Sequence, residues 1–319
     1  MSQLNKRSLN FLSFVIPVFN EEETLPYLRA ELGAWLPSLG ERQVEIFLVD
    51  DGSQDASLDF LEKWAAADAR VKVVSFSRNF GHQSAVTAGL KYCTGDACVI
   101  LDADLQDPLD VVGEMVARYE EGYDVVYGQR VKREGESFFK RCSAWLFYRG
   151  VEAAMDVPLP LDAGDFRLVS RACVDAVNAM PEAHRFLRGM FAWIGFSQVA
   201  VPFVRKARKF GKTKYPLAKM LAFAWSAVTS FSTIPIRLVS YTGLAIALVA
   251  FVAGLWALGT YFAGNSIQGW TSLTIIMAGI GGMILLGLGI IGEYVGKIYE
   301  EVKARPAYIV QRTINVGER

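Results

Sequence analysis

Apolar runs of strand length alternate with amphipathic runs of helix length over the first 130 residues of the chain. The apolar runs are continuous, as expected for parallel strands that are buried on both faces. Polar and small residues follow each run and lead into a helical pattern. The expected strands are residues 11–18, 44–49, 71–76, 97–101 and 124–128. This alternation predicts a doubly wound, mostly parallel α/β sheet with right-handed crossovers.

Two long stretches near the C-terminus carry no charged residue. They cover residues 238–262 and 263–292, and the polar segment 264–269 divides them. Each apolar part is at least ~20 residues long, enough to cross ~30 Å of hydrocarbon, although a buried core helix is the alternative. By the positive-inside rule, the basic residues outside the pair predict that both flanks are cytoplasmic. These residues are Arg237, Lys297, Lys303 and Arg305.

Length, charge and cysteine content narrow the class of protein. A chain of 319 residues can bury a core and is long enough for one soluble domain and a further part. Its 33 basic and 33 acidic residues balance, which argues against a nucleic-acid binder. Four cysteines without a Cys-x-x-Cys pair suit a reducing compartment and argue against structural zinc. Pro17 and the acidic residues after it end the first apolar run too early for a signal peptide, so we expect a cytosolic large domain.

Two aspartates follow the fourth apolar run, at the strand end where open α/β sheets bind ligands. One residue separates Asp102 from Asp104, so both can lean to the same side once the strand opens into a loop. Two hard carboxylate ligands suit Mg²⁺ or Mn²⁺, and such an ion usually carries phosphates too. The alternative is a turn that caps the next helix. We expect that role for Asp107, with Pro108 as the first residue of a helix to about Glu121.

The loops after the first three expected strands offer groups that suit a nucleotide. Phe19 can stack on a base, Glu21 can reach a sugar, and Asp51 can accept a hydrogen bond from a base or a ribose hydroxyl. Arg78 adds a cation at the same edge. The alternatives are an ordinary turn and helix cap at residues 50–53 and a surface ion pair at Arg78.

Basic and aromatic residues share two later helical patterns, at residues 138–152 and 185–196. A helix of this kind beside a membrane suits the lipid surface, but an ordinary amphipathic helix packed on the sheet fits equally well. Residues 216–233 form a third helical pattern. We expect that third helix to run along the membrane interface into the first span.

Four motifs stand at the ends of the expected strands. They are Pro17-Val18-Phe19-Asn20-Glu21, Asp50-Asp51-Gly52-Ser53, Ser77-Arg78-Asn79-Phe80-Gly81 and Asp102-Ala103-Asp104-Leu105-Gln106-Asp107-Pro108. In order and spacing these motifs resemble those of the family 2 glycosyltransferases, which have the GT-A fold.

Later segments support a narrower resemblance. They are Gly164-Asp165-Phe166-Arg167-Leu168, Arg185-Phe186-Leu187-Arg188-Gly189, Gly211-Lys212-Thr213-Lys214-Tyr215, Gly292-Glu293-Tyr294-Val295-Gly296 and Glu301-Val302-Lys303-Ala304-Arg305-Pro306. With them the chain resembles the polyprenyl-phosphate glycosyltransferases, closest to the bactoprenol glucosyltransferases of O-antigen modification and related to the dolichyl-phosphate mannose synthases. The resemblance covers residues 12–310.

The resemblance implies inverting transfer of a hexose, glucose from UDP-glucose, to undecaprenyl phosphate at the cytoplasmic face of the membrane. It places the metal at Asp102 and Asp104, with Gln106 beside the metal or the sugar. It implies that the acceptor phosphate binds a basic residue after the fifth strand, here Arg130, and that a basic loop, here residues 208–214, contacts phosphate. The nucleotide contacts map to Pro17, Phe19, Glu21, Asp51 and Arg78, with Asp50 beside them.

The chemistry of such a reaction needs cations more than a base. A lipid monophosphate has a second pKa near ~6, so at neutral pH it is largely a dianion and already a usable nucleophile. We expect Arg130, Lys140 and Arg141 on the acceptor side. The metal, with Arg208 and Lys214, is expected on the diphosphate leaving group.

Asp165 is a further expected site residue whose role is open. It can orient the sugar hydroxyls or the acceptor, or it can act as a base. The alternative is a purely structural ion pair with Arg167.

These expectations divide the chain into four parts. They are a cytosolic GT-A glycosyltransferase domain (1–215), interfacial helices (216–236), two transmembrane helices with a short periplasmic turn (237–293) and a cytosolic tail (294–319). We expect a multi-pass protein of the inner membrane with both termini in the cytoplasm. The glycine-rich second span suits a homo-oligomer, for which the resemblance favours a tetramer, although packing between the two spans is equally consistent.

Other functions fit less of the sequence. A processive polysaccharide synthase carries a Gln-x-x-Arg-Trp signature and more spans, but residues 185–189 lack the tryptophan. Transfer of another sugar to the same lipid, of the mannose, GlcNAc or aminoarabinose type, is an alternative. A membrane-anchored protein that binds nucleotide sugars without turnover is a second alternative, but it would need neither Asp104 nor the acceptor-side cations.

Overall fold

The computed structural model describes residues 5–130, 163–182, 185–204 and 270–317, with scattered positions between 239 and 252. Contacts group the chain into two compact units. The first consists of Met1–Glu152, Val157–Met220 and Pro306–Arg319, and the second of Ala153–Asp156 and Leu221–Arg305. Several expected features lie outside the described residues: the helices at 138–152 and 216–233, most of the first expected span, Lys140, Arg141, Arg208 and Lys214.

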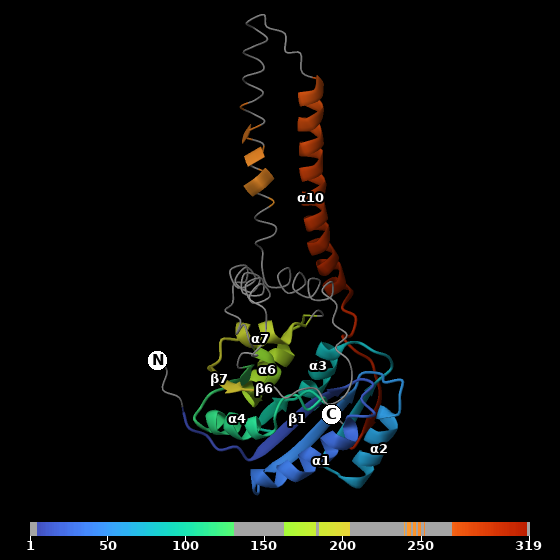
Figure 1. The fold of residues 1–319 in the computed structure, drawn as a ribbon, viewed down its shortest axis with the longest axis vertical. Coiled ribbons are helices and arrows are strands. Elements are labelled where there is room, and N and C mark those ends of the chain that lie inside the picture. The colour runs from blue at the N-terminus through green and yellow to red at the C-terminus, as the bar shows by residue number, and fades with distance from the viewer. Residues whose placement is uncertain are drawn as a thin grey trace, which may run out of the picture. The chain divides into compact units, whose positions relative to one another are not determined.

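A mixed sheet with the strand order β7-β5-β6-β4-β1-β2-β3-β8 forms the centre of the first unit (Figure 1). Four strands in the middle of this order pair in parallel, as the alternating apolar runs predict. They are β1 (Phe11–Val18), β2 (Gln43–Asp50), β3 (Val71–Phe76) and β4 (Ala97–Ile100). Nearly every side chain of β1 and β4 is buried, which explains why their sequences are continuously apolar.

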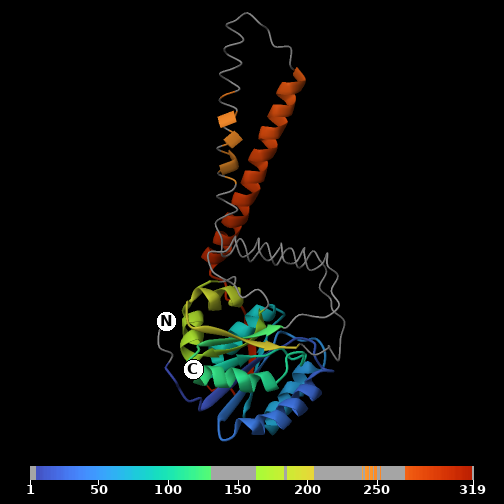
Figure 2. The same ribbon diagram turned by 60° about the vertical axis from the view of Figure 1, so that its left-hand side comes forward.

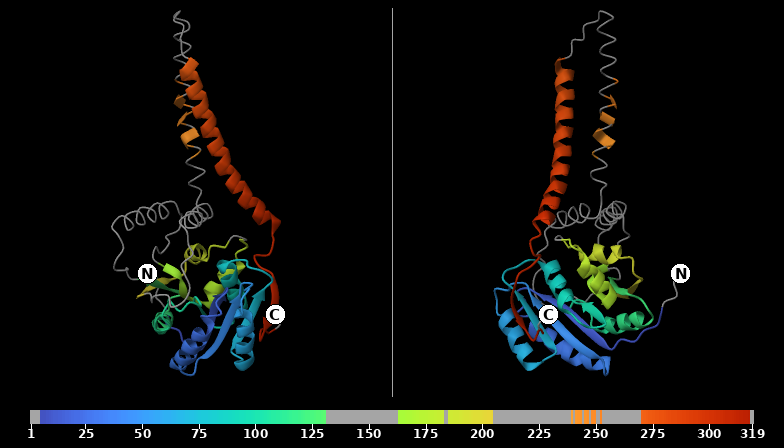
Figure 3. Two further views of the ribbon diagram at one scale, coloured as in Figure 1. Left: turned by 45° about the vertical axis from the view of Figure 1, so that its right-hand side comes forward. Right: turned by 180° about the vertical axis from the view of Figure 1, so that it is seen from behind.

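The remaining strands flank this parallel core. Strand β5 (Val125–Arg130) is reached through the antiparallel strand β6 (Ala163–Ser170), and β7 (Gln198–Phe203) runs parallel to β5. Strand β8 (Val310–Ile314) lies antiparallel to β3 at the other edge, drawn in red in Figure 3. The predicted doubly wound, mostly parallel sheet is confirmed, whereas the strands β6, β7 and β8 are additions to the prediction.

Helices cover both faces of the sheet (Figure 2). On one face α1 (Leu25–Trp35), α2 (Ser57–Ala67) and α4 (Asp110–Glu120) share a buried cluster with alternate residues of the strands. On the other face α3 (His82–Tyr92) contacts β1 and β2, and α6 (Arg171–Ala179) contacts α3. The short helices η1 (Leu36–Leu39) and α7 (Leu187–Trp193) complete the described part of this unit.

The order of the strands places the site. From β1 the chain builds β2 and β3 on one side, and then crosses to place β4 on the other side of β1. Open α/β sheets bind ligands outside the carboxyl ends of the strands at such a switch point. Here that point lies between the loops that follow Val18 of β1 and Ile100 of β4. These two loops carry the expected base-stacking and metal-binding motifs.

The helix after the aspartate motif begins later than the sequence suggests. It starts at Asp110, and the residue before it, Leu109, is its N-cap without a side-chain hydrogen bond. The expected cap at Asp107, with Pro108 as the first helical residue, is therefore wrong. Asp107 is buried, with 1% of its surface exposed, in the loop between β4 and α4.

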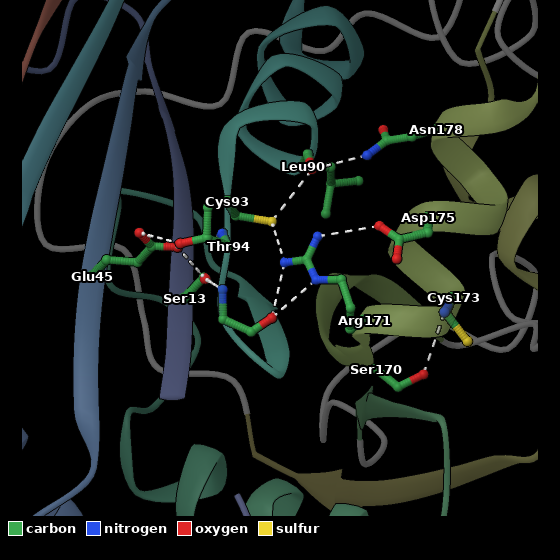
Figure 4. Close-up of polar contacts among 11 residues, drawn as sticks. Ser13, Glu45, Leu90, Cys93, Thr94, Ser170, Arg171, Cys173, Asp175 and Asn178 are labelled. Carbon is green, nitrogen blue, oxygen red and sulfur yellow. Dashed lines mark hydrogen bonds and ion pairs between the residues drawn. The ribbon is translucent and has the colours of Figure 1, made fainter. Parts of the chain in front are cut away.

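A polar cluster closes the end of the sheet opposite this switch point (Figure 4). Arg171, the first residue of α6, donates to the carbonyl of Gly95 from Nε and Nη2 (3.0 and 2.9 Å) and to Sγ of Cys93 from Nη2 (3.3 Å). The expectation of ordinary buried thiols is confirmed for Cys93, Cys98 and Cys173, while Cys142 lies outside the described residues.

One long helix dominates the described part of the second unit. Helix α10 (Trp270–Lys303) starts directly after the polar segment 264–269 that was expected as a turn. Its segment Gly279–Lys303 has a mean hydropathy of 1.5 and is long and apolar enough to cross a membrane. Within the described residues it is the one such helix, so a single span is supported where the sequence predicts two.

Candidate active site

Hydrogen bonds tie the loops after β1 and β2 together at the carboxyl edge of the sheet. The backbone N–H of Asn20 donates to Ser53 Oγ at 3.0 Å, and Gln54 N–H donates back to Asn20 Oδ1 at 2.8 Å. Asn20 has φ of 54°, a left-handed conformation that asparagine tolerates better than most residues. Glu21 N–H donates to Ser57 Oγ at 2.8 Å. These hydrogen bonds hold the two loops together as one side of the site, which is called the wall below.

Asp51 connects this wall to the loop after β3. Its carboxylate accepts hydrogen bonds from the backbone N–H groups of Phe80 at 2.7 Å and Gly81 at 2.9 Å. Burial raises the pKa of Asp51, against the lowering effect of these two hydrogen bonds. Gly52 allows the loops to meet: its φ is +69°, and a Cβ there would lie 2.5 Å from the backbone carbon of Arg78.

The other expected nucleotide contacts occupy the same edge. Phe19 is 42% exposed, and Arg78 is exposed with its guanidinium carbon 3.9 Å from the centre of the Phe80 ring. Glu21 accepts from Thr24 Oγ1 at 2.6 Å. Pro17 is buried within β1, where it pairs with Val49 of β2.

Asp50 has a structural role in this arrangement. Its carboxylate accepts from Ser53 N–H at 3.1 Å and from Ser75 Oγ at 2.8 Å, and only 1% of its surface is exposed. These contacts agree with the alternative interpretation of residues 50–53 as a turn. The contacts of Pro17, Phe19, Glu21, Asp51 and Arg78 with a nucleotide stay predictions.

The two aspartates expected to bind a metal leave the end of β4 as predicted. Asp104 accepts from the backbone N–H of Gln106 at 3.1 Å, and Leu105 between them has φ of 53°. Gln106 is 8% exposed, whereas the Asp102 side chain is 31% exposed. The loop thus turns tightly so that its carboxylates stay at the edge of the sheet.

The two carboxylates of this pair suit a hard divalent cation that takes its other ligands from phosphate and water. Mg²⁺ is usually bound by one or two carboxylates, with phosphate and water oxygens in the remaining positions. Among the described residues no group of three or more His, Cys, Asp or Glu side chains could hold a metal ion by itself. The carboxylates of Asp102 and Asp104 are the donor type that such an ion takes, and the binding of Mg²⁺ or Mn²⁺ by this pair stays a prediction.

Strand β6 brings a third carboxylate to the aspartate loop. Ile100 of β4 pairs with Arg167 of β6 in antiparallel register, so Asp165 lies opposite the chain just beyond β4. His82, the first residue of α3, links the two carboxylates: its Nε2 lies 3.7 Å from Asp102 Oδ1 and 3.4 Å from Asp165 Oδ2. A metal-binding candidate and the candidate base thus share one imidazole neighbour.

Arg188 of α7 fixes Asp165 from another direction. Its Nε donates to Asp165 Oδ1 at 2.8 Å and its Nη2 donates to Oδ2 at 3.1 Å, a bidentate geometry. Burial would raise the pKa of Asp165, but the interactions with His82 and Arg188 outweigh it and hold that pKa far below its ordinary range. Asp165 is therefore a fixed anion at neutral pH.

His82 responds to the same carboxylates. Burial would lower its pKa, but the hydrogen bond to Asp165 and the charges of Asp102 and Asp165 raise it above the ordinary value. Its side chain is 41% exposed, so the imidazole lies at the rim of the site rather than inside the core. An imidazolium here would neutralise part of the negative charge that the two aspartates bring together.

The alternative pairing of Asp165 with Arg167 is not what the structure shows. Arg167 is 4% exposed, donates from Nη2 to the Gly164 carbonyl at 2.9 Å and lies 5.0 Å from the centre of the Phe191 ring. Burial lowers the pKa of Arg167 to about 10, which still leaves it charged at neutral pH. The ion-pair partner of Asp165 is Arg188.

Arg130 is the last residue of β5 rather than the first residue after it. Its guanidinium lies beside Gly164 of β6. A Cβ added at Gly164 would be only 2.8 Å from Arg130 Nη2. Gly164 directly precedes Asp165. The structure thus brings Arg130 next to the Asp165 end of β6, while its contact with an acceptor phosphate stays a prediction.

His82 and Arg188 are the residues that sequence reasoning missed. His82 directly follows the Ser77–Gly81 motif and Arg188 lies within the Arg185–Gly189 motif, but the motifs alone indicate no role for either. His82 is one of only two histidines in the chain and follows Gly81 at the start of a helix, which is a usable signal. Nothing local marks Arg188, because its partner is 23 residues earlier in the chain.

Comparison with known proteins agrees with this geometry. A model of the family described as "Glycosyl transferase family 2" matches residues 13–177. The "Uncharacterized glycosyltransferase YkcC" of Bacillus subtilis is 44% identical over 308 residues, which are 96% of this chain and 95% of that protein.

Two further relatives carry more specific names. The "Prophage bactoprenol glucosyl transferase homolog" of Escherichia coli K12 is 38% identical over 302 residues, covering 94% of this chain and 98% of that protein. The "Bactoprenol glucosyl transferase" of Shigella phage SfII is 37% identical over 303 residues, covering 95% and 98%. At 94% and 95% of this chain, these matches extend past the motifs of the candidate site into α10.

Proposed function

The chain belongs to glycosyl transferase family 2, and from that membership we propose that this glycosyltransferase moves a hexose to a polyprenyl phosphate, specifically glucose from UDP-glucose to undecaprenyl phosphate. The transfer inverts the anomeric carbon and takes place at the cytoplasmic face of the membrane. Relatives named bactoprenol glucosyl transferase, similar over almost their whole length, support the lipid acceptor and the sugar. Family membership also sets aside the non-catalytic binding protein.

One observation carries the proposed mechanism: Asp165 is bound by Arg188 and lies next to His82 and the aspartate loop. A carboxylate whose pKa is far below its ordinary range does not accept a proton at neutral pH. A lipid monophosphate does not need such a base, because its second pKa near ~6 leaves it largely a dianion. We therefore assign Asp165 to orientation of the sugar or the acceptor, rather than to proton transfer.

The donor side of the reaction needs charge neutralisation. Asp102 and Asp104 would hold Mg²⁺ or Mn²⁺, and such an ion would supply positive charge to the departing diphosphate. Phe19, Glu21, Asp51 and Arg78 belong to loops at the same edge, and we propose that they contact the base, ribose and phosphate of the donor. Asp51 keeps acceptor capacity for this contact, because a carboxylate offers about four lone-pair sites and only part of them bind Phe80 and Gly81.

The acceptor side rests on Arg130. Its position beside Gly164 places a cation near Asp165, where a lipid phosphate would meet the anomeric carbon. Electrostatic attraction at this point offsets the repulsion between the lipid phosphate and the donor diphosphate. Lys140 and Arg141 on the acceptor side, and Arg208 and Lys214 on the leaving group, stay predictions.

The membrane part of the proposal follows from the acceptor, which is itself a lipid. Helix α10 supports one crossing, and we propose a second at residues 238–262, in a multi-pass protein of the inner membrane. Both termini and the catalytic unit would then be cytoplasmic. A homo-oligomer, with the tetramer as the favoured state, remains part of the proposal.

The decisive experiment offers the purified full-length protein undecaprenyl phosphate, Mg²⁺ or Mn²⁺ and a panel of nucleotide sugars. The panel contains UDP-glucose, UDP-GlcNAc, GDP-mannose and UDP-aminoarabinose, and mass spectrometry identifies the glycolipid. A hexose–undecaprenyl phosphate formed only with UDP-glucose is the expected result. A product with another donor would correct the sugar, and no lipid-linked sugar with any donor would contradict the proposed reaction.

A further inference from the structure

The C-terminal segment of the chain reaches the donor side of the site. After α10 the chain returns to the first unit as β8, which pairs antiparallel with β3 from Val73–Ile314 to Phe76–Val310. The register shifts between Ser75 and Phe76, at the carboxyl end of β3. One further hydrogen bond continues past the strands, from Ser77 N–H to the carbonyl of Ile309 at 3.0 Å. The tail therefore contacts the first residue of the Ser77–Gly81 loop.

Aromatic rings extend this contact to Arg78. The Tyr308 ring stacks on Phe76 with centroids 4.8 Å apart and an angle of 13°. Phe76 meets Phe80 edge to face at 5.8 Å and 89°. Phe80 in turn lies under the Arg78 guanidinium at 3.9 Å. Four side chains thus form one column from the tail to the cation expected to contact the donor.

We propose that Tyr308 is a positioning residue for the donor nucleotide, acting through the rings of Phe76 and Phe80 on Arg78. This inference rests on the proposed function, in which Arg78 contacts the nucleotide. The backbone N–H of Phe80 also donates to Asp51, so the same ring column positions one of the groups that bind that carboxylate. Loss of the stacked ring would loosen both donor contacts and leave Arg130 and Asp165 on the acceptor side unchanged.

The proposed positioning role of Tyr308 belongs to its aromatic ring and not to its hydroxyl group. Its hydroxyl oxygen is buried and has no hydrogen-bond partner among the described residues. Burial raises the pKa of Tyr308 to about 12, so the phenol is neutral at physiological pH. Phenylalanine can therefore replace tyrosine here without loss of a polar contact, which makes Tyr308→Phe a matched control for Tyr308→Ala.

Asn315 supplies a second control on the same tail. Its Nδ2 donates to the carbonyls of Ala65 and Val71 at 2.8 and 2.9 Å, so it anchors the tail at the opposite end of β3. Asn315→Ala should lower the thermal stability of the protein without a change in nucleotide affinity. If Tyr308→Ala acted only by loosening β8 in general, Asn315→Ala and Tyr308→Ala would weaken nucleotide affinity alike.

The test measures UDP affinity by calorimetry with Mn²⁺ on the full-length protein in detergent, and the KM values for donor and acceptor. Tyr308→Ala should raise the Kd for UDP and the donor KM about 3- to 10-fold, the scale of one aromatic contact, and leave the acceptor KM unchanged. Tyr308→Phe should restore both values. In an Arg78→Ala background, Tyr308→Ala should raise the Kd by a smaller factor than in the wild type, because the column then has no guanidinium to position and only the Asp51 contact is left to loosen.

The outcomes separate the two claims. If the wild-type protein binds UDP and Tyr308→Ala binds it equally well, the positioning role is wrong while the proposed function stands. The positioning role would also be wrong if Tyr308→Ala and Arg78→Ala reduced UDP affinity additively in the double variant. Equal rises in the donor KM and the acceptor KM of Tyr308→Ala would contradict it as well. No UDP binding by the wild-type protein would overturn the proposed function, and this inference with it.

Discussion

Asp165 and Arg188 form a bidentate ion pair, with N···O distances of 2.8 and 3.1 Å, between strand β6 and helix α7. The Asp165 side chain is only 15% exposed, so this contact is largely shielded from water. The fork of an arginine fixes both oxygens of a carboxylate, which a lysine cannot do. Arg188 thus sets the orientation of a carboxylate that lies beside the aspartate loop and directly follows Gly164, the neighbour of Arg130.

Substitution of Arg188 should therefore affect the chemical step more than donor binding. Arg188→Lys keeps the charge but loses the fork, and we expect kcat to fall about tenfold, the effect of roughly 1.4 kcal/mol on the barrier. Arg188→Ala should reduce kcat by a further factor of about ten and lower the free energy of unfolding by about 1–3 kcal/mol, because a partly buried carboxylate loses its partner. Steady-state kinetics and urea unfolding measure the two effects. A changed donor KM with unchanged kcat would contradict the orienting role of Asp165.

The aspartate loop and Arg130 should separate donor binding from acceptor binding. Asp104→Ala should abolish transfer and remove the Mn²⁺-dependent part of UDP affinity, so that EDTA no longer weakens UDP binding by this variant. Arg130→Ala should spare UDP affinity and raise the KM for undecaprenyl phosphate. Calorimetry with and without EDTA, together with acceptor titrations, checks both. Equal loss of UDP affinity in the two variants would contradict this division.

Gly52 offers a test of how closely the loops after β2 and β3 must approach. Gly52→Ala places a Cβ at φ of +69° and 2.5 Å from the Arg78 backbone, so the two loops must separate. The left-handed conformation alone costs about 1–2 kcal/mol, and we expect a lower melting temperature and a higher donor KM.

Gly113 provides the matched control for that substitution. It lies within α4, has nothing within 4 Å of an added Cβ and is remote from the site. Gly113→Ala should stabilise the protein by about 0.5–1 kcal/mol, since alanine is favoured over glycine in a helix. Thermal melts followed by circular dichroism compare the two variants. Equal effects at the two positions would show that the loop contact carries no strain.

Glu45 makes the stability of the sheet depend on pH. It is 2% exposed and accepts from Ser13 Oγ at 2.6 Å, Lys72 Nζ at 2.5 Å and Thr94 N–H at 2.6 Å. Burial would raise the pKa of Glu45, but the bonds to Lys72, Ser13 and Thr94 together lower it below the ordinary 4.5. The unfolded chain then binds this proton more readily. Its contribution to stability is therefore complete above pH 4.5 and is lost as the pH falls through the folded-state pKa.

Glu45→Gln should expose this dependence. At pH 7 the variant should unfold at a lower urea concentration than the wild type, because an amide cannot accept all three hydrogen bonds and loses the charge opposite Lys72. Between pH 5 and 3 the difference should shrink. Urea titrations at several pH values in this interval measure it. A difference that stays constant from pH 7 to pH 3 would mean that Glu45 does not titrate with folding.

The pattern of apolar residues along the sequence predicted the part of the fold that consists of buried parallel strands. The runs at residues 11–18 and 97–101 are apolar because both faces of β1 and β4 are covered, so their ends, and the aspartates after them, were visible in the sequence. The start of α4 was misplaced because Asp107-Pro108 has the composition of a helix cap. Composition does not reveal that this aspartate is buried in the loop.

Strand β6 could not be predicted in the same way. Its sequence contains Asp165 and Arg167, which are unusual in the middle of a sheet and break the apolar run. The groups that compensate these charges are mostly distant in the chain: Arg188 and His82 for Asp165, and the Phe191 ring for Arg167, whose guanidinium also donates to the nearby Gly164 carbonyl. Only the folded chain brings these partners together, so the central residues of the site depend on contacts that have no local pattern.

The pairing of β8 with β3 has a consequence for how the protein is made. Val74 pairs with Thr313, so the strand that completes the sheet leaves the ribosome only after the whole of α10 has been synthesised. Until then the outer edge of β3 has unpaired backbone groups, and closing so long a loop is slow. The Ser77–Gly81 loop after β3 gains its contacts with the tail at the same moment, through the Ile309 carbonyl and the Tyr308 ring. Nascent chains that lack β8 would thus lack a finished catalytic sheet, and sugar transfer would begin only once synthesis is complete.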